Sequence, residues 1–120
     1  MSGSDDNKMR MRIHIGERDK FDGKPLYQAI VDLLRSRRYA GATVLRGIMG
    51  FGAGAHVHSD RFLELSMDLP LVIECVESAE NIEAVMPELE AMLEGGLITV
   101  DPTRVLLQRG GRRKSKGRET

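Results

Sequence analysis

Residues 9–15 read Met-Arg-Met-Arg-Ile-His-Ile, with apolar side chains at every second position and basic side chains between them. An alternation with a period of two is typical of a β-strand that buries one face and exposes the other. Residues 16–24 are rich in turn-forming residues. Pro25 then suits the first turn of a helix, because its missing N–H is not needed there. This stretch predicts a strand, a turn and the start of a helix.

The next elements are marked by a change of period from two to nearly four. Apolar residues recur at helical spacing from Leu26 to Leu34, and Gly41 is expected to end that helix. Residues 43–49 are predicted to form a second strand. Residues 50–55 are glycine-rich and too small-sided to pack on their own, which favours a loop.

An extended segment and a second helix are predicted next. Residues 61–76 are expected to form one long strand, or two strands with a break at Pro70. Five of the six side chains in 71–76 are apolar, which favours cover on both faces of that strand. Ser78 is expected to cap a helix through its hydroxyl, and Pro87 to kink or divide that helix. The predicted apolar stripe of this helix consists of Ile82, Val85, Met86, Leu89, Met92 and Leu93.

The C-terminal elements complete the order βαββαβ. Gly95 and Gly96 are expected to end the second helix, and residues 97–100 and then 104–107 form the final extended piece. This order predicts an α+β protein with a ferredoxin-like sandwich, in which an antiparallel sheet carries two helices on one face.

The folded domain is expected to span residues 9–108, between a disordered N-terminal lead (1–8) and a disordered basic tail (109–120). The chain has 18 basic and 18 acidic residues, but residues 109–118 contain six basic residues and no acidic one. The body is therefore acidic, and no nucleic-acid partner is expected. A single cysteine, Cys75, excludes an internal disulfide framework and favours the cytoplasm.

The predicted fold leaves one face of the sheet without helices. A strand such as 71–76, apolar on both sides, needs cover on that second face. Another copy of the chain would supply it, and a surface coated by the basic tail is the alternative. The sequence therefore favours a homo-oligomer.

Five short motifs occur in order along the chain. Together they resemble the uncharacterised PII-like family called domain of unknown function family 190, over roughly residues 9–108. The motifs are Lys24-Pro25-Leu26-Tyr27, Gly41-Ala42-Thr43-Val44-Leu45-Arg46-Gly47, Gly50-Phe51-Gly52, Asp68-Leu69-Pro70 and Gly96-Leu97-Ile98-Thr99.

That family is distantly similar to the PII signalling proteins. PII proteins are trimers of ferredoxin-like subunits that bind adenine nucleotides in the clefts between subunits. A loop between their second and third strands changes shape with the ligand and docks on transporters or enzymes. The resemblance thus implies a trimeric sensor that binds an adenine nucleotide such as ATP, ADP or AMP. It would signal through residues 50–60 to a membrane transporter or an enzyme.

The resemblance also implies a set of ligand-binding residues. The segment containing Thr43 is similar to the PII Gly-Met-Thr-Val segment near the nucleotide. Gly50 and Gly52 are similar to the Gly-Phe-Gly at the root of the mobile loop. From the residues alone, the same glycines are equally compatible with a flexible hairpin, because no phosphate-loop signature accompanies them.

The loop before the last strand supplies the other implied contacts. Gly95 and Gly96 begin a segment that resembles the PII phosphate loop, in which Arg104 would replace a lysine. This chain lacks the PII Gly-Asp-Gly-Lys series there. Arg46 interrupts an apolar strand, and it is interpreted either as an anion contact or as a surface arginine that extends to solvent.

A metal-binding interpretation competes with the ligand sensor. His56 and His58 are two residues apart, so in an extended segment both point the same way. The alternative function is thus a trimeric divalent-metal-binding protein similar to the CutA proteins. No nucleophile–base arrangement stands out in the sequence, so an enzyme is not expected.

Overall fold

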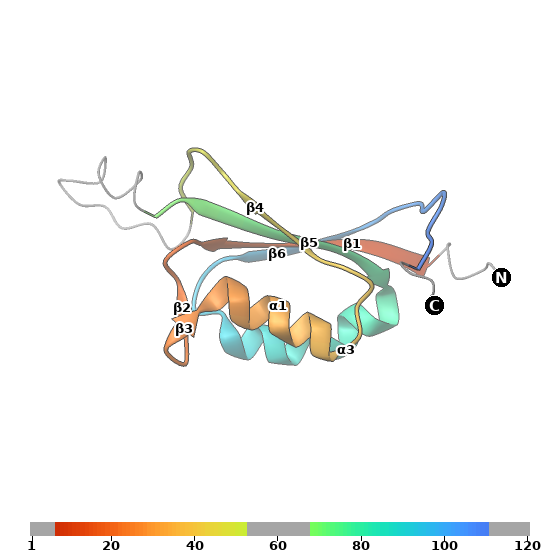
Figure 1. Ribbon diagram of the computed structural model, residues 1–120, viewed down its shortest axis with the longest axis horizontal. Coiled ribbons are helices and arrows are strands. Elements are labelled where there is room, and N and C mark those ends of the chain that lie inside the picture. The colour runs from red at the N-terminus through yellow and green to blue at the C-terminus, as the bar shows by residue number, and fades with distance from the viewer. Residues whose placement is uncertain (1–6, 53–67, 111–120) are drawn as a thin grey trace, which may run out of the picture.

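In residues 7–52 and 68–110, which a computed structural model describes, a four-stranded antiparallel sheet carries two helices on one of its faces (Figure 1). The strand order is β4-β5-β1-β6, and a separate two-stranded hairpin pairs β2 with β3. The elements are β1 (Lys8–Gly16), β2 (Lys20–Phe21), β3 (Lys24–Pro25), α1 (Leu26–Ser36), β4 (Thr43–Arg46), β5 (Pro70–Ser78), α3 (Ala79–Met92) and β6 (Leu97–Pro102). This arrangement confirms the predicted α+β class and agrees with a ferredoxin-like fold.

The core lies between the sheet and the helices, and the two central strands supply its middle. In the register of β1 and β5, Met11 lies opposite Cys75, and Ile13 lies opposite Ile73. Met11, Ile13 and Ile73 are completely buried, and Cys75 is 5% exposed. Burial of one large aliphatic side chain contributes roughly 1.5–3 kcal/mol. The period of two in residues 9–15 therefore specifies which face of β1 meets the helices.

The helices close the core with side chains at helical spacing. α1 buries Leu26, Ala29, Ile30 and Leu34, and α3 buries Ile82, Val85, Leu89 and Met92. The Oγ of Ser78 accepts a hydrogen bond from the backbone N–H of Asn81 at 3.2 Å, so the predicted cap is confirmed. The prediction that Pro87 divides this helix is wrong, because α3 continues through it. Pro87 and Glu83 are both exposed, so water can reach the carbonyl that loses its donor.

Three element ends differ from the sequence prediction. α1 ends at Ser36 rather than near Gly41, and Arg38, two residues later, has a positive φ of 64°. β4 ends at Arg46 rather than at residue 49, because β5 begins at Pro70, whose carbonyl accepts from Gly47, and offers no partner beyond it. β6 is one strand, and the predicted piece 104–107 is not part of it.

The end of β6 has the same cause as the end of β4. The backbone N–H of Thr103 donates to the carbonyl of Lys8 at 3.1 Å, and Lys8 is the first residue of β1. Beyond this bond the neighbouring strand supplies no further groups. Residues 104–110 therefore leave the sheet.

The β2–β3 hairpin was not predicted from the sequence. Asp22 and Gly23 form its turn, both with positive φ, 55° and 86°. Asp-Gly is a preferred pair for a two-residue hairpin turn, since asparagine, aspartate and glycine tolerate that backbone region. The signal was present at residues 22–23, but the strands on either side are only two residues long.

The face of the sheet opposite the helices carries a mixture of charged and apolar side chains. Arg12 and Glu74, directly opposite each other, form an ion pair of 3.3 Å there. Val76 on the same face is 37% exposed. The described residues therefore cover only one face of β5, the face that meets the helices. Two cross-strand rows occupy this open face, namely Thr43-Glu74-Arg12-Thr99 and Leu45-Val72-His14-Leu97.

Candidate functional site

The predicted ligand-binding residues are distributed between the two ends of the sheet. We call these the Gly16 end, where β1 finishes beside Pro70 of β5, and the Lys8 end, where β1 begins beside Ser78. The nine residues of β1 separate them, a distance of roughly 26 Å at about 3.3 Å per residue. Each predicted residue can be assigned to one end or to the middle of the sheet.

Arg46 lies at the Gly16 end, where its side chain is already paired. Its Nη2 lies 2.7 Å from Oε2 of Glu17, a residue just past the end of β1. The backbone N–H of Glu17 donates to the carbonyl of Leu69 at 2.8 Å. In the β4–β5 register Arg46 lies opposite Leu71, so its side chain extends past β5 to reach the neighbouring strand's end. Arg46 is thus an exposed arginine that already has a carboxylate partner in this chain.

Gly47 and Gly50 pack against Pro70 at the same end. A Cβ on Gly47 would lie 2.8 Å from the Cγ of Pro70, and one on Gly50 would lie 3.0 Å from it. The backbone N–H of Gly47 also donates to the carbonyl of Pro70 at 2.7 Å. Close approach to Pro70 is therefore one reason for glycine at these two positions. Gly52 has no such neighbour within 4 Å.

Gly95 and Gly96 connect α3 to β6 at the Gly16 end as well. Gly96 has a φ of +114°, and a Cβ there would lie 2.6 Å from the carbonyl oxygen of His14. That oxygen belongs to the backbone of β1 and cannot move aside. Gly95 has open space around its Cα. The two glycines thus differ, since only Gly96 is required by packing.

Three carboxylates surround the Gly16 end. The Oδ2 of Asp19 accepts from the backbone N–H of Gly16 at 3.0 Å, and the Oδ1 of Asp68 accepts from that of Arg18 at 2.9 Å. Glu17 is the third. These carboxylates fasten the turn after β1 to the start of β5.

Thr43 lies elsewhere, on the open face of the sheet. It is directly opposite Glu74, which pairs with Arg12. Thr43 and Arg46 are three residues apart in one strand, so their side chains emerge on opposite faces. The structure therefore does not bring these two predicted contacts together in one chain.

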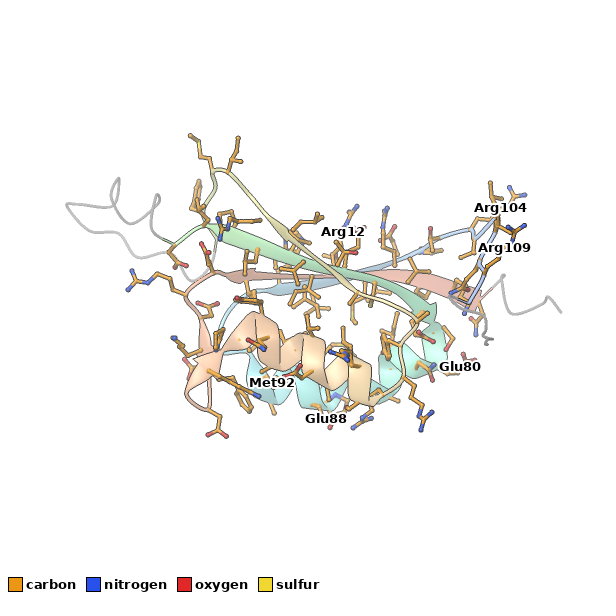
Figure 2. All side chains as sticks on the ribbon, in the orientation of Figure 1. Arg12, Glu80, Glu88, Met92, Arg104 and Arg109 are labelled. Carbon is orange, nitrogen blue, oxygen red and sulfur yellow. The ribbon has the colours of Figure 1, made fainter. Side chains whose placement is uncertain are left out.

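Arg104 lies at the Lys8 end, in the segment that leaves β6 after Thr103. Figure 2 places Arg104 and Arg109 together, far from the tip of β4. Both arginines are exposed, and Leu106 and Leu107 between them are 82% and 68% exposed. Arg46 and Arg104 therefore cannot contact one small ligand within a single chain.

The metal hypothesis rests on residues that the structure does not describe. His56 and His58 lie in the undescribed segment 53–67, as does most of the predicted 50–60 loop. Among the described residues, no group of three or more histidine, cysteine, aspartate or glutamate side chains is arranged to hold a metal ion. Within that same part of the chain, no helix is long and apolar enough to cross a membrane.

The pKa values of Cys75 and Tyr39 are raised, mainly because both side chains are removed from water. Burial, followed by the charges of Glu77 and Glu74, raises the pKa of the Cys75 thiol to about 11. Burial also raises the pKa of Tyr39 to about 12, and its hydroxyl donates to the backbone carbonyl of Asn81 at 2.9 Å. The neutral thiol is a weak nucleophile, which agrees with the predicted structural role of Cys75.

A groove of about 560 Å³ opens on the helical side, next to the β2–β3 hairpin. It contains none of the predicted ligand-binding residues. Its charged side chains are largely paired, since Lys24 lies 3.6 Å from Asp32 and Arg37 contacts Glu88. The lining consists of Phe21, Asp22, Lys24, Ala29, Asp32, Leu33, Glu88, Ala91 and Met92.

Comparison with known proteins assigns the chain to a family. The sequence model of DUF190, described as "Uncharacterized ACR", matches residues 8–105. The chain belongs to the DUF190 family. The match begins at the first residue of β1 and contains Thr43, Arg46 and Arg104, so both ends of the sheet fall within the DUF190 region.

Two relatives match this DUF190 chain over most of their length. UPF0166 protein MJ1524 of Methanocaldococcus jannaschii is 40% identical over 96 residues, which cover 79% of this chain and 88% of the relative. A UPF0166 protein of Aquifex aeolicus is 31% identical over 99 residues, which cover 82% of this chain and 93% of the relative. These names state no ligand, activity or partner.

Sequence reasoning missed Glu17, Asp19 and Asp68 as members of the Gly16 end. Asp68 stands in one of the five motifs without a predicted partner, and Glu17 and Asp19 lie among turn-forming residues. Their contacts join segments 29 and 50 positions apart, Glu17 with Arg46 and Arg18 with Asp68. The turn propensity of residues 16–24 indicated only that the chain bends there.

Proposed function

We propose that this chain is a PII-like regulatory protein. It assembles into a homo-oligomer, a trimer, and binds a small anionic ligand between neighbouring copies. An adenine nucleotide is the ligand class that the motif resemblance favours, and a sensor is favoured over an enzyme because no catalytic arrangement was found in the sequence. Its single buried thiol, Cys75, agrees with a cytoplasmic location.

The observation that carries the proposal is the separation of Arg46 from Arg104. Arg46 lies at the Gly16 end and Arg104 at the Lys8 end, with the length of β1 between them. A ligand that uses both arginines must therefore lie where the Gly16 end of one copy meets the Lys8 end of the next. A single copy offers an anion only one of the two groups.

Charge favours this head-to-tail contact. At the Gly16 end the carboxylates of Glu17, Asp19 and Asp68 outnumber the guanidinium groups of Arg18 and Arg46, whereas at the Lys8 end exposed Arg104 and Arg109 accompany Glu80. Surfaces of opposite charge attract each other and fix orientation. A contact between two different surfaces of identical chains closes into a ring when the rotation between copies allows it.

Exposed apolar side chains at both ends support the same contact. Near the Gly16 end Ile48, Met49 and Phe51 are 94%, 79% and 83% exposed. At the Lys8 end Leu106 and Leu107 are also largely exposed. Removing such groups from water would favour association by about 25 cal/mol per Å² of apolar area buried.

The open face of the sheet is proposed to point into the assembly. Three apolar side chains of this face are partly exposed, namely Leu45 (49%), Val76 (37%) and Leu97 (56%). A second copy would cover these side chains. The ion pairs Arg12–Glu74 and Arg10–Asp101 lie on the same face. Because each charge already has a partner within the chain, burying this face would leave none of these four charges unpaired.

Signalling is proposed to occur through residues 50–60, between β4 and β5 in the sequence. A ligand at Arg46 would touch the start of this segment and change its preferred conformation. Such a ligand acts as a signal only if it binds one conformation better than another. The regulated partner would be a membrane transporter or an enzyme, as the resemblance to PII implies.

Two measurements on the full chain test the proposal. Light scattering on a size-exclusion column should give the mass of a trimer at micromolar concentration. A thermal-shift panel should show that ATP, ADP or AMP raises the melting temperature, by on the order of 10 °C at 100 times Kd. A monomeric mass, or a panel in which divalent metals stabilise the chain and no nucleotide does, would contradict it.

A further inference from the structure

Arg46 has an anionic partner within the chain before any ligand binds. The distance from its Nη2 to Oε2 of Glu17 is 2.7 Å, and the side chains of Arg46 and Glu17 are 62% and 27% exposed. The arginine is thus accessible to an external anion. The carboxylate that holds it is the less exposed of the two.

The backbone around Glu17 is held in place by three hydrogen bonds. The Glu17 N–H donates to Leu69 at 2.8 Å, and the neighbouring Gly16 and Arg18 N–H groups donate to Asp19 and Asp68. Glu17 therefore stays at the Gly16 end when Arg46 moves away. Arg46 has the longer and more exposed side chain, so it is the partner that can change its contact.

We propose that Glu17 is an internal competitor for the ligand and that it lowers the affinity of the site by holding Arg46. This inference rests on the proposed function, because it concerns the same anion. A bound phosphate must replace the Glu17 carboxylate on the guanidinium, which binds both anions through charge-assisted hydrogen bonds. Breaking the pair also separates β4 from the turn after β1, so ligand binding changes the contacts of the chain immediately before residue 50.

The size of the effect follows from the exposure of the pair. Exposed ion pairs contribute little, so their loss changes an equilibrium by up to about fivefold. Removing the competitor should therefore tighten nucleotide binding by about two- to fivefold. A change of net charge alone would act equally from any nearby position, and the test must separate these two causes.

The experiment is isothermal titration of the full chain with ATP at fixed ionic strength. Glu17→Gln removes the carboxylate, and Glu17→Asp keeps the charge but shortens the side chain so that it cannot make the same contact. Glu94→Gln removes one exposed carboxylate between α3 and Gly95, at the same Gly16 end, as a control for net charge. Both Glu17 variants should bind ATP two- to fivefold more tightly than the unmodified chain, and Glu94→Gln should not.

The outcomes distinguish the two proposals. If the unmodified chain binds ATP and Glu17→Gln binds no more tightly, the competitor role is wrong and the proposed function stands. If Glu17→Gln binds more tightly but Glu17→Asp does not, net charge explains the gain and the competitor role is again wrong. If only the Glu17 variants bind measurably, both proposals are supported. If no variant binds, both are wrong.

Discussion

The Gly16 end and the Lys8 end of the same sheet are built in different ways. At the Gly16 end, Gly47 and Gly50 press against Pro70, Gly96 presses against His14, and carboxylates fasten the turn after β1. At the Lys8 end, the chain leaves the sheet after Thr103 with exposed arginines and leucines. The backbone of the Gly16 end is tightly packed, although Ile48, Met49 and Phe51 near it are exposed, whereas the segment that leaves the Lys8 end carries exposed side chains without such packing among the described residues.

This difference shows where stability and where association should respond to mutation. Tight backbone contacts at the Gly16 end make that end sensitive to added volume. Exposed side chains at the Lys8 end contribute little to the folded monomer and are free to contact another copy. Substitutions at the Gly16 end should therefore lower the stability of the folded chain. Substitutions at the Lys8 end should instead weaken assembly.

The largest effect is expected at Gly96. Gly96→Ala forces a Cβ to within 2.6 Å of a backbone oxygen of β1 at a φ of +114°, and it should lower the free energy of unfolding by about 3 kcal/mol or more. Gly95→Ala, next to it in open space, should change it by less than about 1 kcal/mol. Urea unfolding of both variants measures the difference, and equal stabilities would mean that the turn before β6 is not packed as described.

A large effect on assembly, but not on folding, is expected at the Lys8 end. Leu106→Ser combined with Leu107→Ser should weaken association of the oligomer by at least about 100-fold, given roughly 1.5–3 kcal/mol per buried leucine. The melting temperature of the dissociated chain should stay the same, because both side chains are exposed in it. Sedimentation across a concentration series measures the association. An unchanged mass at every concentration would remove these leucines from the interface.

The smallest effects are expected at the ion pairs of the two ends. Glu17→Gln breaks the pair with Arg46 at the Gly16 end, and Asp101→Asn breaks a 2.8 Å pair with Arg10 near the Lys8 end. Both pairs are partly exposed, so each variant should lose less than about 1 kcal/mol of stability, and less still at high salt. Chemical denaturation at two salt concentrations measures this. A loss above about 2 kcal/mol for Glu17→Gln would show that Glu17 stabilises the fold. Its effect on ligand binding would then have to be measured apart from its effect on folding.

The order of elements could be predicted from the sequence because its signals are local. Alternation in residues 9–15, helical spacing in 26–34 and the Ser78 cap each depend on neighbours only a few positions away. The ends of β4 and β6 could not be predicted, because each ends where its partner strand runs out. The extra turn at Asp22–Gly23 carried a readable signal, yet its strands were too short to give any alternation.

The contacts of the predicted site residues could be read from the sequence less completely than the fold. The positions of Thr43 and Arg46 in one strand already imply opposite faces, so that separation was available from the sequence. The pairing of Arg46 with Glu17 was not, because the two residues are 29 positions apart and meet only after β5 lies between their strands. The distance between Arg46 and Arg104 likewise depends on the strand register, which no single motif specifies.

The central claim is that opposite ends of neighbouring copies build one ligand site, and mixing two defective variants tests it most directly. Arg46→Ala and Arg104→Ala chains are unfolded together in equal amounts, refolded and titrated with ATP. Each variant alone should lack tight sites. The mixture should recover tight binding at about one junction in four, where an intact Gly16 end meets an intact Lys8 end. If the mixed assemblies bind no better than either variant alone, the two arginines do not share a site between copies.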